Sequence, residues 1–255
     1  MERYERNILL RGVGEAGQAA LNGARVLQVG AGGLGSPVAY YLAAAGVGTL
    51  GIMDGDRVDE SNLNRQILHT SERVGEEKVI SAARTIEALN PSITVQPIPE
   101  RLTPENALSI MADYDVVVDC VDSFSGKFLI NDAAVLLGKT YIHCGVVGWG
   151  GQLFTHRPGG PCLRCLMPFI PGGGPQSTDE GILGAVAGSL GSIQASEVVK
   201  AITGAGTLME DRILFVDFFD MTFSEMKFAR NSACPVCGEH PTITSLIVEN
   251  YEIPI

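Results

Sequence analysis

The chain has 255 residues, of which 45% are hydrophobic and 18% are charged, and its formal net charge is −11. This length allows one large α/β domain or two small ones with a well-filled core. The negative charge argues against non-specific binding to nucleic acid, and no apolar run is long enough to span a membrane. The N-terminus, MERYER, has no hydrophobic signal-peptide region, so we expect a cytoplasmic protein.

The first predicted elements form a nucleotide-binding unit. After an arm and a short helix over residues 1–23, an apolar run starting at Val26 leads into a glycine-rich turn, GAGGLG, at residues 30–35. An alanine-rich helical pattern follows, and a second apolar run ends at Asp54. In a βαβ unit of this order the glycines let the backbone approach a phosphate, and the acid accepts from ribose hydroxyls. The turn alone fits NAD as well as ATP.

The rest of the chain alternates helical and extended patterns, which predicts a Rossmann-like α/β fold with a mostly parallel central sheet and C-terminal antiparallel strands. Asp122 follows a strand buried on both faces, at the end where such sheets bind ligands. The expected elements are helices over 71–89, 103–111, 128–137 and 182–202, strands over 93–98, 114–122, 140–147 and 149–155, and a closing hairpin over 213–219 and 225–229.

The sequence has no internal repeat or convincing linker, so we predict a single domain over residues 1–255. Its parts are the N-terminal arm and helix (1–23), a nucleotide-binding core (24–157), a Pro/Gly-rich crossover excursion (158–181), and a final part with a helix, closing strands, a cysteine pair and a tail (182–255).

Two Cys-x-x-Cys pairs predict a zinc knuckle. Cys162 and Cys165 form the first pair, and Cys234 and Cys237 the second, in the knuckle-like context Cys-Pro-x-Cys-Gly. Two such turns complete a closed tetrahedral Cys₄ site, in which zinc is structural. The alternative is a redox pair at a helix start.

Taken together, these motifs resemble the ThiF/MoeB/HesA family of ubiquitin-activating-enzyme-like adenylyltransferases. The resemblance spans almost the whole chain, from Arg3 to about Ile247. It rests on Arg3-Tyr4-x-Arg6, the glycine turn, Asp54-x-Asp56, Asn62-Leu63-Asn64-Arg65-Gln66, Lys78, Asp119-Cys120-x-Asp122, Gly150-Gly151-Gln152 and both cysteine pairs. It implies that the protein binds ATP and Mg²⁺ and adenylates the C-terminal Gly-Gly of a ubiquitin-like sulfur carrier protein of the ThiS or MoaD kind, releasing pyrophosphate.

The resemblance also implies roles for single residues. Asn62, Arg65 and Lys78 would hold the triphosphate, Asp54 the ribose, and Asp122 the Mg²⁺ ion. Arg6 looks like an arginine that reaches into the partner's active site in a homodimer. Asp56 would assist the metal or cap the following turn. The full set implied for the nucleotide is Gly30, Gly32, Gly33, Gly35, Asp54, Asp56, Ser61, Asn62, Asn64, Arg65, Gln66, Lys78, Asp122 and Ser123.

The residue chemistry agrees with this assignment. A carboxylate that attacks the α-phosphorus of ATP is already ionised at neutral pH, so no general base is required. Fixed cations, namely Arg6, Arg65, Lys78 and Mg²⁺, would stabilise the charge that builds on the phosphoryl oxygens. His69, His143, His156 and His240 are scattered, and we expect solvated or structural roles for them.

The chain departs from the family at four positions, one of which is Val121 in place of a threonine. Where many relatives carry a cysteine that forms a thioester or persulfide with the carrier, this chain has Ser177. We therefore expect the reaction to stop at the adenylate and a separate sulfurtransferase to supply sulfur. Ser123 replaces an asparagine, and Lys127 replaces an arginine and loses its bidentate fork.

Three other functions compete with this one. A tRNA-modifying dehydratase of the same superfamily would need a basic surface, which a net charge of −11 does not favour. An inert scaffold for a ubiquitin-like partner would not need the residues Arg65, Lys78 and Asp122. An NAD-dependent dehydrogenase has no use for the motif at residues 62–66.

Overall fold

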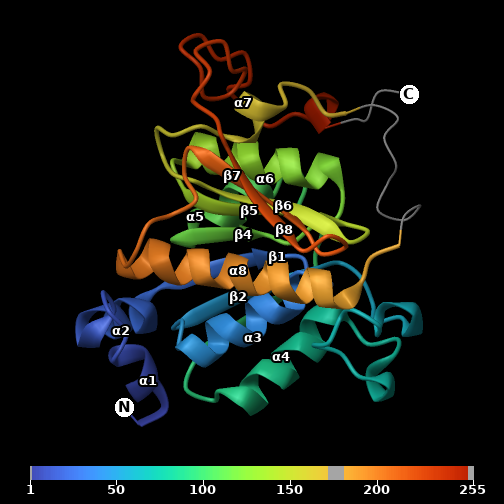
Figure 1. The fold of residues 1–255 in the computed structure, drawn as a ribbon. Coiled ribbons are helices and arrows are strands. Elements are labelled where there is room, and N and C mark those ends of the chain that lie inside the picture. The colour runs from blue at the N-terminus through green and yellow to red at the C-terminus, as the bar shows by residue number, and fades with distance from the viewer. Residues whose placement is uncertain (1, 172–180, 252–255) are drawn as a thin grey trace.

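A computed structural model of the chain describes residues 2–171 and 181–251, and within these residues eight strands form one sheet (Figure 1). The strand order is β3-β2-β1-β4-β5-β6-β7-β8; the first five strands run parallel and the last three are joined antiparallel. The chain progresses outward from β1 in both directions, so a crevice opens at the carboxyl ends of β1 and β4. The bounds are β1 Arg25–Val29, β2 Thr49–Met53, β3 Thr94–Ile98, β4 Val116–Asp119, β5 Thr140–Val147, β6 Gly150–His156, β7 Arg212–Asp217 and β8 Thr222–Lys227.

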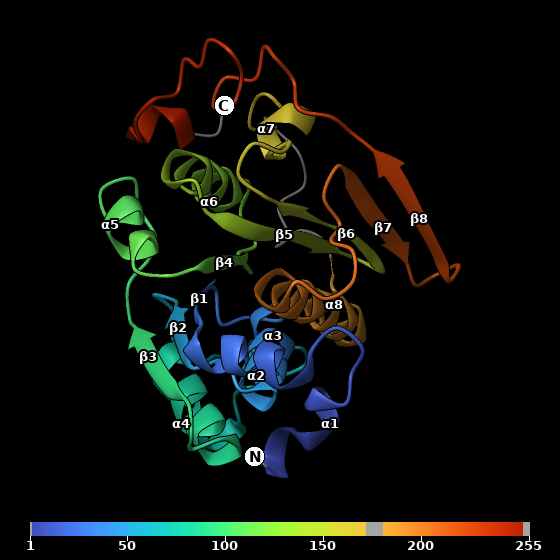
Figure 2. The same ribbon diagram turned by 90° about the vertical axis from the view of Figure 1, so that its left-hand side faces the viewer.

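Helices cover both faces of this sheet. Figure 2 shows α3, α4 and α8 on one side and α5 and α6 on the other. No helix of the described residues is long and apolar enough to cross a membrane. The helices are α1 Glu5–Ile8, α2 Gly14–Gly23, α3 Gly35–Ala45, α4 Lys78–Leu89, α5 Ala107–Ala112, α6 Phe124–Leu137, α7 Leu163–Leu166 and α8 Gly184–Thr203, with short 3₁₀ turns at η1 Glu2–Tyr4, η2 Glu60–Asn62, η3 Ser71–Arg73 and η4 Val248–Tyr251.

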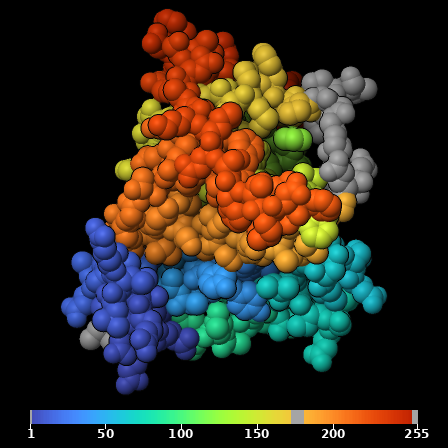
Figure 3. Space-filling view, viewed as in Figure 1, coloured from blue at the N-terminus to red at the C-terminus, as the bar shows by residue number. Residues whose placement is uncertain are grey.

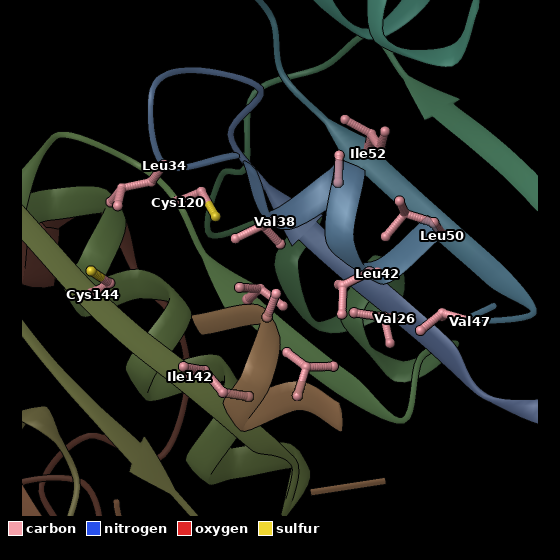
Figure 4. Close-up of a cluster of buried hydrophobic side chains, with 14 of the residues drawn as sticks. Val26, Leu34, Val38, Leu42, Val47, Leu50, Ile52, Cys120, Ile142 and Cys144 are labelled. Atoms are coloured by element: carbon pink, nitrogen blue, oxygen red, sulfur yellow. The ribbon is translucent and has the colours of Figure 1, made fainter. Parts of the chain in front are cut away.

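The sheet separates two hydrophobic clusters. The first joins α3, α4 and α8 to one face of the strands, and its central side chains, among them Val38, Leu50 and Ile142, are fully buried (Figure 4). The second lies under α5 and α6 on the other face and includes Val29, Met53 and Leu129. Successive strand residues point to opposite faces, so a strand that is apolar throughout supplies both clusters. The α/β fold with C-terminal antiparallel strands is confirmed.

Three predicted helix starts are wrong, each because a hydrogen bond near the boundary decides where the helix begins. The helix expected from residue 71 begins at Lys78, since Gly75 has a φ of 89° and its N–H bonds to the carbonyl of Val58 (2.8 Å). The helix expected from Thr103 begins at Ala107, after a turn in which the Thr103 N–H donates to Asn106 Oδ1 (2.8 Å). The helix expected from residue 128 begins at residue 124, because the preceding serine caps it.

Candidate functional site

A pocket of about 510 Å³ opens at the carboxyl ends of β1 and β4, where the strand order reverses. It brings together ten of the residues predicted for the nucleotide, drawn from segments far apart in the sequence. These residues are Gly30, Gly32, Gly33, Asp54, Asp56, Arg65, Gln66, Lys78, Asp122 and Ser123.

The glycine turn forms the floor of this pocket and tolerates no side chain at two positions. Gly30 has a φ of 103°, and a Cβ there would lie 2.5 Å from the carbonyl oxygen of Cys120. A Cβ on Gly35 would collide with the carbonyl of Gly30, so Gly35 serves the close packing of α3 on the turn rather than the pocket lining. Gly30, Gly32 and Gly33 line the pocket without side chains, so backbone is exposed there where a phosphate would approach.

Asp54, at the end of β2, is fixed by two backbone contacts. One carboxylate oxygen accepts the N–H of Ala31 (2.8 Å), and the other accepts the N–H of Asp56 (2.8 Å). These bonds tie the glycine turn to β2. Because each carboxylate oxygen can accept two hydrogen bonds, Asp54 can still accept from ribose hydroxyls.

Two cations lie on one carboxylate at the edge of the pocket. Lys78, the first residue of α4, is buried, and its ammonium lies 3.1 Å from Asp56. Arg101, in the loop after β3, pairs with the other oxygen of the same carboxylate. Asp56 thus holds Lys78 in place, a contact that neither role expected for it includes.

Arg65 is held by its own loop. Its Nη1 donates to the carbonyl of Ser61 (3.2 Å) and to Asn64 Oδ1 (3.0 Å). The carbonyl of Asn62 accepts the N–H groups of Arg65 and Gln66 (3.1 and 2.9 Å). Ser61, Asn62 and Asn64 do not line the pocket; they shape the loop that brings Arg65 to it.

Asp122 lies three residues after β4, exposed at the pocket, and the described residues give it no ion pair. Ser123 beside it is the N-cap of α6, and its hydroxyl accepts the N–H of Gly126 (3.2 Å). The Ser123 hydroxyl is therefore engaged in holding a helix end.

Lys127 lines the pocket, but its ammonium is engaged by buried groups. Its ammonium lies 3.2 and 3.3 Å from the two oxygens of the buried Asp119 and donates to the carbonyl of Cys144. His143 Nδ1 donates to the same carboxylate (2.8 Å). Burial favours a raised pKa for Asp119, but the charge of Lys127 and the hydrogen bond from His143 outweigh it and lower that pKa. This group joins β4, β5 and the first turn of α6.

The histidines have the structural roles that were expected for the buried ones. His69 accepts from Ser81 (2.9 Å) and donates to the carbonyl of Ala31 (2.9 Å), so it supports the glycine turn. His156 Nδ1 donates to the carbonyl of Pro161 (2.9 Å). Burial lowers the pKa of His69, His143 and His156, which keeps them neutral, while His240 is exposed.

Arg6 lies apart from the residues that were predicted for the nucleotide. It is exposed on α1, at the left of Figure 1, whereas the segment that carries Arg65 (cyan) lies at the right. Arg6 does not line its own chain's pocket. Ser177 lies outside the described residues.

The four cysteines of the two pairs converge on one point. Their sulfurs all lie within 4.8 Å of one another, and the separations from Cys162 are 3.9, 3.7 and 3.5 Å. A tetrahedral zinc ion with Zn–S bonds of about 2.3 Å would separate its sulfurs by about 3.8 Å. The N–H of Asn231 also donates to Cys165 (3.4 Å), a contact that would stabilise a thiolate. The donor set therefore fits a structural zinc ion, with all four positions taken by protein.

We expect protein purified under reducing conditions to contain about one zinc per chain. Changing Cys237 to serine should lower both the zinc content and the melting temperature, because the ion joins the crossover excursion to the C-terminal part. The measurements are elemental analysis and thermal unfolding. Cys144, which is buried away from the cluster, provides the control, and Cys144→Ser should leave the zinc content unchanged. A zinc content well below one in wild-type protein contradicts the assignment.

Comparisons with known proteins agree with this arrangement. The sequence matches the ThiF family over residues 4–236. It is 44% identical to a sulfur carrier protein adenylyltransferase of Thermus thermophilus over 260 residues, which is 99% of this chain and 95% of that protein. It is 42% identical to the SAMP-activating enzyme E1 of Haloferax volcanii, covering 94% and 89% of the two chains.

Longer and more distant relatives share part of this likeness. The adenylyltransferase and sulfurtransferase MOCS3 of Bos taurus is 43% identical over 99% of this chain, which spans 56% of that protein. The crystal structure of E. coli MccB with ATP has the same fold, with a TM-score of 0.82 and 24% identity over 92% of this chain and 73% of that one. With its sequence matched over nearly all of its length, the chain belongs to the ThiF family.

Proposed function

We propose that this protein uses ATP to adenylate the C-terminal glycine carboxylate of a ubiquitin-like sulfur carrier protein and releases pyrophosphate. The observation that carries the proposal is the pocket at the strand reversal, where Asp54, Arg65, Lys78 and Asp122 meet around an exposed glycine backbone. Relatives with 44% and 42% identity that are named for this activity support the same conclusion.

The reaction needs positioning and charge more than acid–base groups. The carrier carboxylate forms a bond to the α-phosphorus of ATP as the bond to the pyrophosphate oxygen breaks, and the electron pair leaves with pyrophosphate. Arg65 and Lys78 would stabilise the oxygens that gain charge, and Asp122 would hold Mg²⁺, which neutralises the phosphates when bound. Asp56 keeps Lys78 oriented until the triphosphate arrives.

An exposed apolar surface beside the pocket provides a place for the carrier. The β7–β8 hairpin stands uncovered on the face shown in Figure 3, and Phe219, at its turn, is 72% exposed. Trp149 packs edge-on against Phe219, with 5.7 Å between the ring centres. The residue before it, Gly148, accepts the N–H of Leu183 at its carbonyl, and Leu183 follows the pocket residue Ile182. We call the exposed apolar residues of this region the hairpin surface: Trp149, Phe219 and Met221 around the turn, Phe215 and Met226 on one face of the hairpin, and Phe223 on the other.

Exposed apolar side chains that gather in one region of the surface are typical of a protein interface. Because the surface continues into the pocket through residues 148 and 182, a globular carrier seated on it would extend its C-terminal tail toward the α-phosphate. The occupant that fits is therefore a small ubiquitin-like domain with an apolar face and a flexible Gly-Gly end.

A second apolar groove lies between α3, α4 and α8, and we propose that a second copy of the chain covers it. The small residues of α8 there allow close approach of another helix. Its lining is Pro37, Tyr40, Tyr41, Ala44, Ile67, Leu89, Ala185, Gly188, Ser189 and Ser192. A homodimer formed on this side gives Arg6 a route to the partner's pocket, which it does not reach in its own chain.

Changing Arg6 to alanine should lower exchange of pyrophosphate into ATP, because one cation is removed from the transition state. If Arg6 acts in the partner's pocket, mixing Arg6→Ala with Asp122→Ala subunits restores one intact site in each mixed dimer. The measurement is exchange activity across mixing ratios. Arg11→Ala, which removes an exposed arginine just after the same short helix, is the control and should stay active. Absence of rescue in mixed dimers argues against action across the dimer.

The carrier step is tested by exchange of labelled pyrophosphate into ATP. Exchange should depend on a ThiS-like or MoaD-like carrier that ends in Gly-Gly and should disappear when its last glycine is removed, because the attacking carboxylate is then misplaced. Binding of the carrier without exchange would instead identify the chain as a scaffold.

We further propose that the product stays an adenylate on this protein. Ser177 stands where many relatives carry the cysteine, and a serine forms no persulfide. A separate sulfurtransferase would then deliver sulfur to the activated carrier.

A further inference from the structure

The two halves of the nucleotide pocket differ in character. On the α3 and α8 side it is lined by the glycine turn, Arg65, Gln66 and Ala187. On the α5 and α6 side, polar groups such as Asp122 and Lys127 lie at the start of α6, and the rest of the lining includes an apolar patch that belongs to the second hydrophobic cluster or packs against it: Val29, Met53, Leu102, Leu129 and Tyr251. A flat purine base gains from apolar contacts and the phosphates from the glycine backbone and cations. The apolar patch on the α5 and α6 side is therefore the base half of the pocket.

The C-terminal end of the described chain forms a wall of this base half. Val248 and Tyr251, which begin and end η4, both line the pocket, and Tyr251 is only 8% exposed. These residues lie more than a hundred positions after α6 in the sequence, so a specific contact must keep them at the pocket.

That contact is a buried carboxylate on α6. The Tyr251 hydroxyl donates to Asp132 Oδ2 (3.1 Å), and Asp132 is fully buried. Burial, together with the negative charge of Asp132, raises the pKa of Tyr251, so the phenol remains a donor.

Asp132 is itself held by the cysteine knuckle. Arg164, between the cysteines of the first pair, donates from Nε and Nη2 to the two carboxylate oxygens at 2.7 to 3.0 Å. The guanidinium also lies over the ring of Phe128, 4.8 Å from its centre, and is 4% exposed. The N–H of Leu163 donates to Asn131 (2.7 Å), which fixes the same turn to α6. A buried guanidinium that donates two hydrogen bonds to a carboxylate allows only one relative orientation, so Arg164 fixes the position of Asp132.

We propose that η4 closes the base half of the nucleotide pocket, and that Arg164 of the knuckle holds it there through Asp132 and Tyr251. Tyr251 and Val248 then determine how tightly the base is held, while Arg164 and Asp132 are positioning residues. The cysteine site thereby acts on nucleotide binding as well as on stability. This inference rests on the proposed function, because it takes ATP as the ligand.

The test compares two ligands that share their phosphates. ATP has a base, and inorganic tripolyphosphate does not, so a wall on the base half affects only the first. Tyr251→Ala should weaken ATP binding about tenfold or more, since an aromatic contact is lost. Tyr251→Phe keeps the ring but releases it from Asp132, and should weaken ATP binding about threefold. Neither change should alter the affinity for tripolyphosphate.

Hydrogen exchange reports on the position of the segment itself. In Tyr251→Phe, amides of residues 246–251 should exchange faster than in wild type, while those of β1 and β4 should not. Ile247→Ala is the matched control, because Ile247 is exposed in the same segment and does not line the pocket. It should leave both affinities unchanged.

Several results would overturn the inference. One is an unchanged affinity for ATP in both Tyr251 variants. Another is an equal loss of affinity for ATP and for tripolyphosphate, which indicates a general loss of structure. Calorimetric titration of both ligands separates these results from the expected one. If the wild-type chain binds ATP but shows no carrier-dependent exchange, the proposed function fails and the binding test of η4 still decides this inference.

Discussion

Replacing Asp122 with alanine is expected to lower carrier-dependent exchange of pyrophosphate into ATP by about a thousandfold. The carboxylate lies exposed at the pocket after β4, and the described residues provide it with no cationic partner. It is therefore available to a metal ion bound to the phosphates. Without it, the charge on the leaving pyrophosphate would lose its main neutralising centre.

The fold should not change, because among the described residues Asp122 makes no side-chain hydrogen bond or ion pair that joins two elements. Asp113→Ala provides the control: it removes an exposed carboxylate at the amino end of the same strand, away from the pocket, and should leave exchange intact. Asp122→Asn should recover part of the activity at high Mg²⁺, since an amide oxygen is a weaker ligand. Full exchange in Asp122→Ala would refute the role of this residue.

Replacing Lys127 with methionine should lower the free energy of unfolding by about 3–5 kcal/mol. The change leaves the fully buried carboxylate of Asp119 without its ammonium partner, and the neutral His143 supplies only a hydrogen bond. Denaturant unfolding followed by circular dichroism measures the loss.

Lys139→Met is the matched comparison, because Lys139 follows the other end of α6 and donates to two backbone carbonyls without a charged partner. Lys139→Met should lower the free energy of unfolding by only about 1 kcal/mol. A loss that is similarly small in Lys127→Met would show that the buried pair contributes little. The pKa of Asp119 is lowered in the folded state, so its stabilisation is present above the unfolded pKa of about 3.9 and disappears as the pH falls through the folded value.

The parts of the site that could be predicted are those with a local sequence pattern. The glycine turn, Asp54 and Asp122 each follow a buried strand, and the carboxyl ends of parallel strands meet at one edge of the sheet. The cysteine pairs could be predicted because thiol spacing of this kind has few other uses. In each case the pattern and the function lie in the same few residues.

The parts that could not be predicted depend on contacts between distant segments. Nothing in the sequence near Arg101 indicates that it shares Asp56 with Lys78, since the pairing needs the loop after β3 to pass over the end of β2. In the sequence, Tyr251 is an ordinary residue of the C-terminal tail, and only the fold brings it into contact with Asp132. Nothing in the sequence near Lys127, a residue of the pocket lining, indicates that its ammonium pairs with the buried carboxylate of Asp119.

The helix starts failed for a related reason. A hydrophobic period marks the face that a helix buries, but it does not mark the first turn. Ser123 and Gly75 decide where α6 and α4 begin through single hydrogen bonds, one within the first turn and one to a segment 17 residues away.

The sheet ends in two outer strands, which are protected from aggregation to different degrees. Pro97 lies in β3 and removes one donor from that edge, as is common in edge strands. β8 pairs on one side with β7, and no strand of the described residues pairs with its other side. Glu225 and Lys227 lie on the same face of β8 as Phe223, so that face carries charged side chains beside an apolar one. When the carrier is absent, solubility therefore depends on these charges and on the net charge of −11, and salt that screens them should promote association along β8.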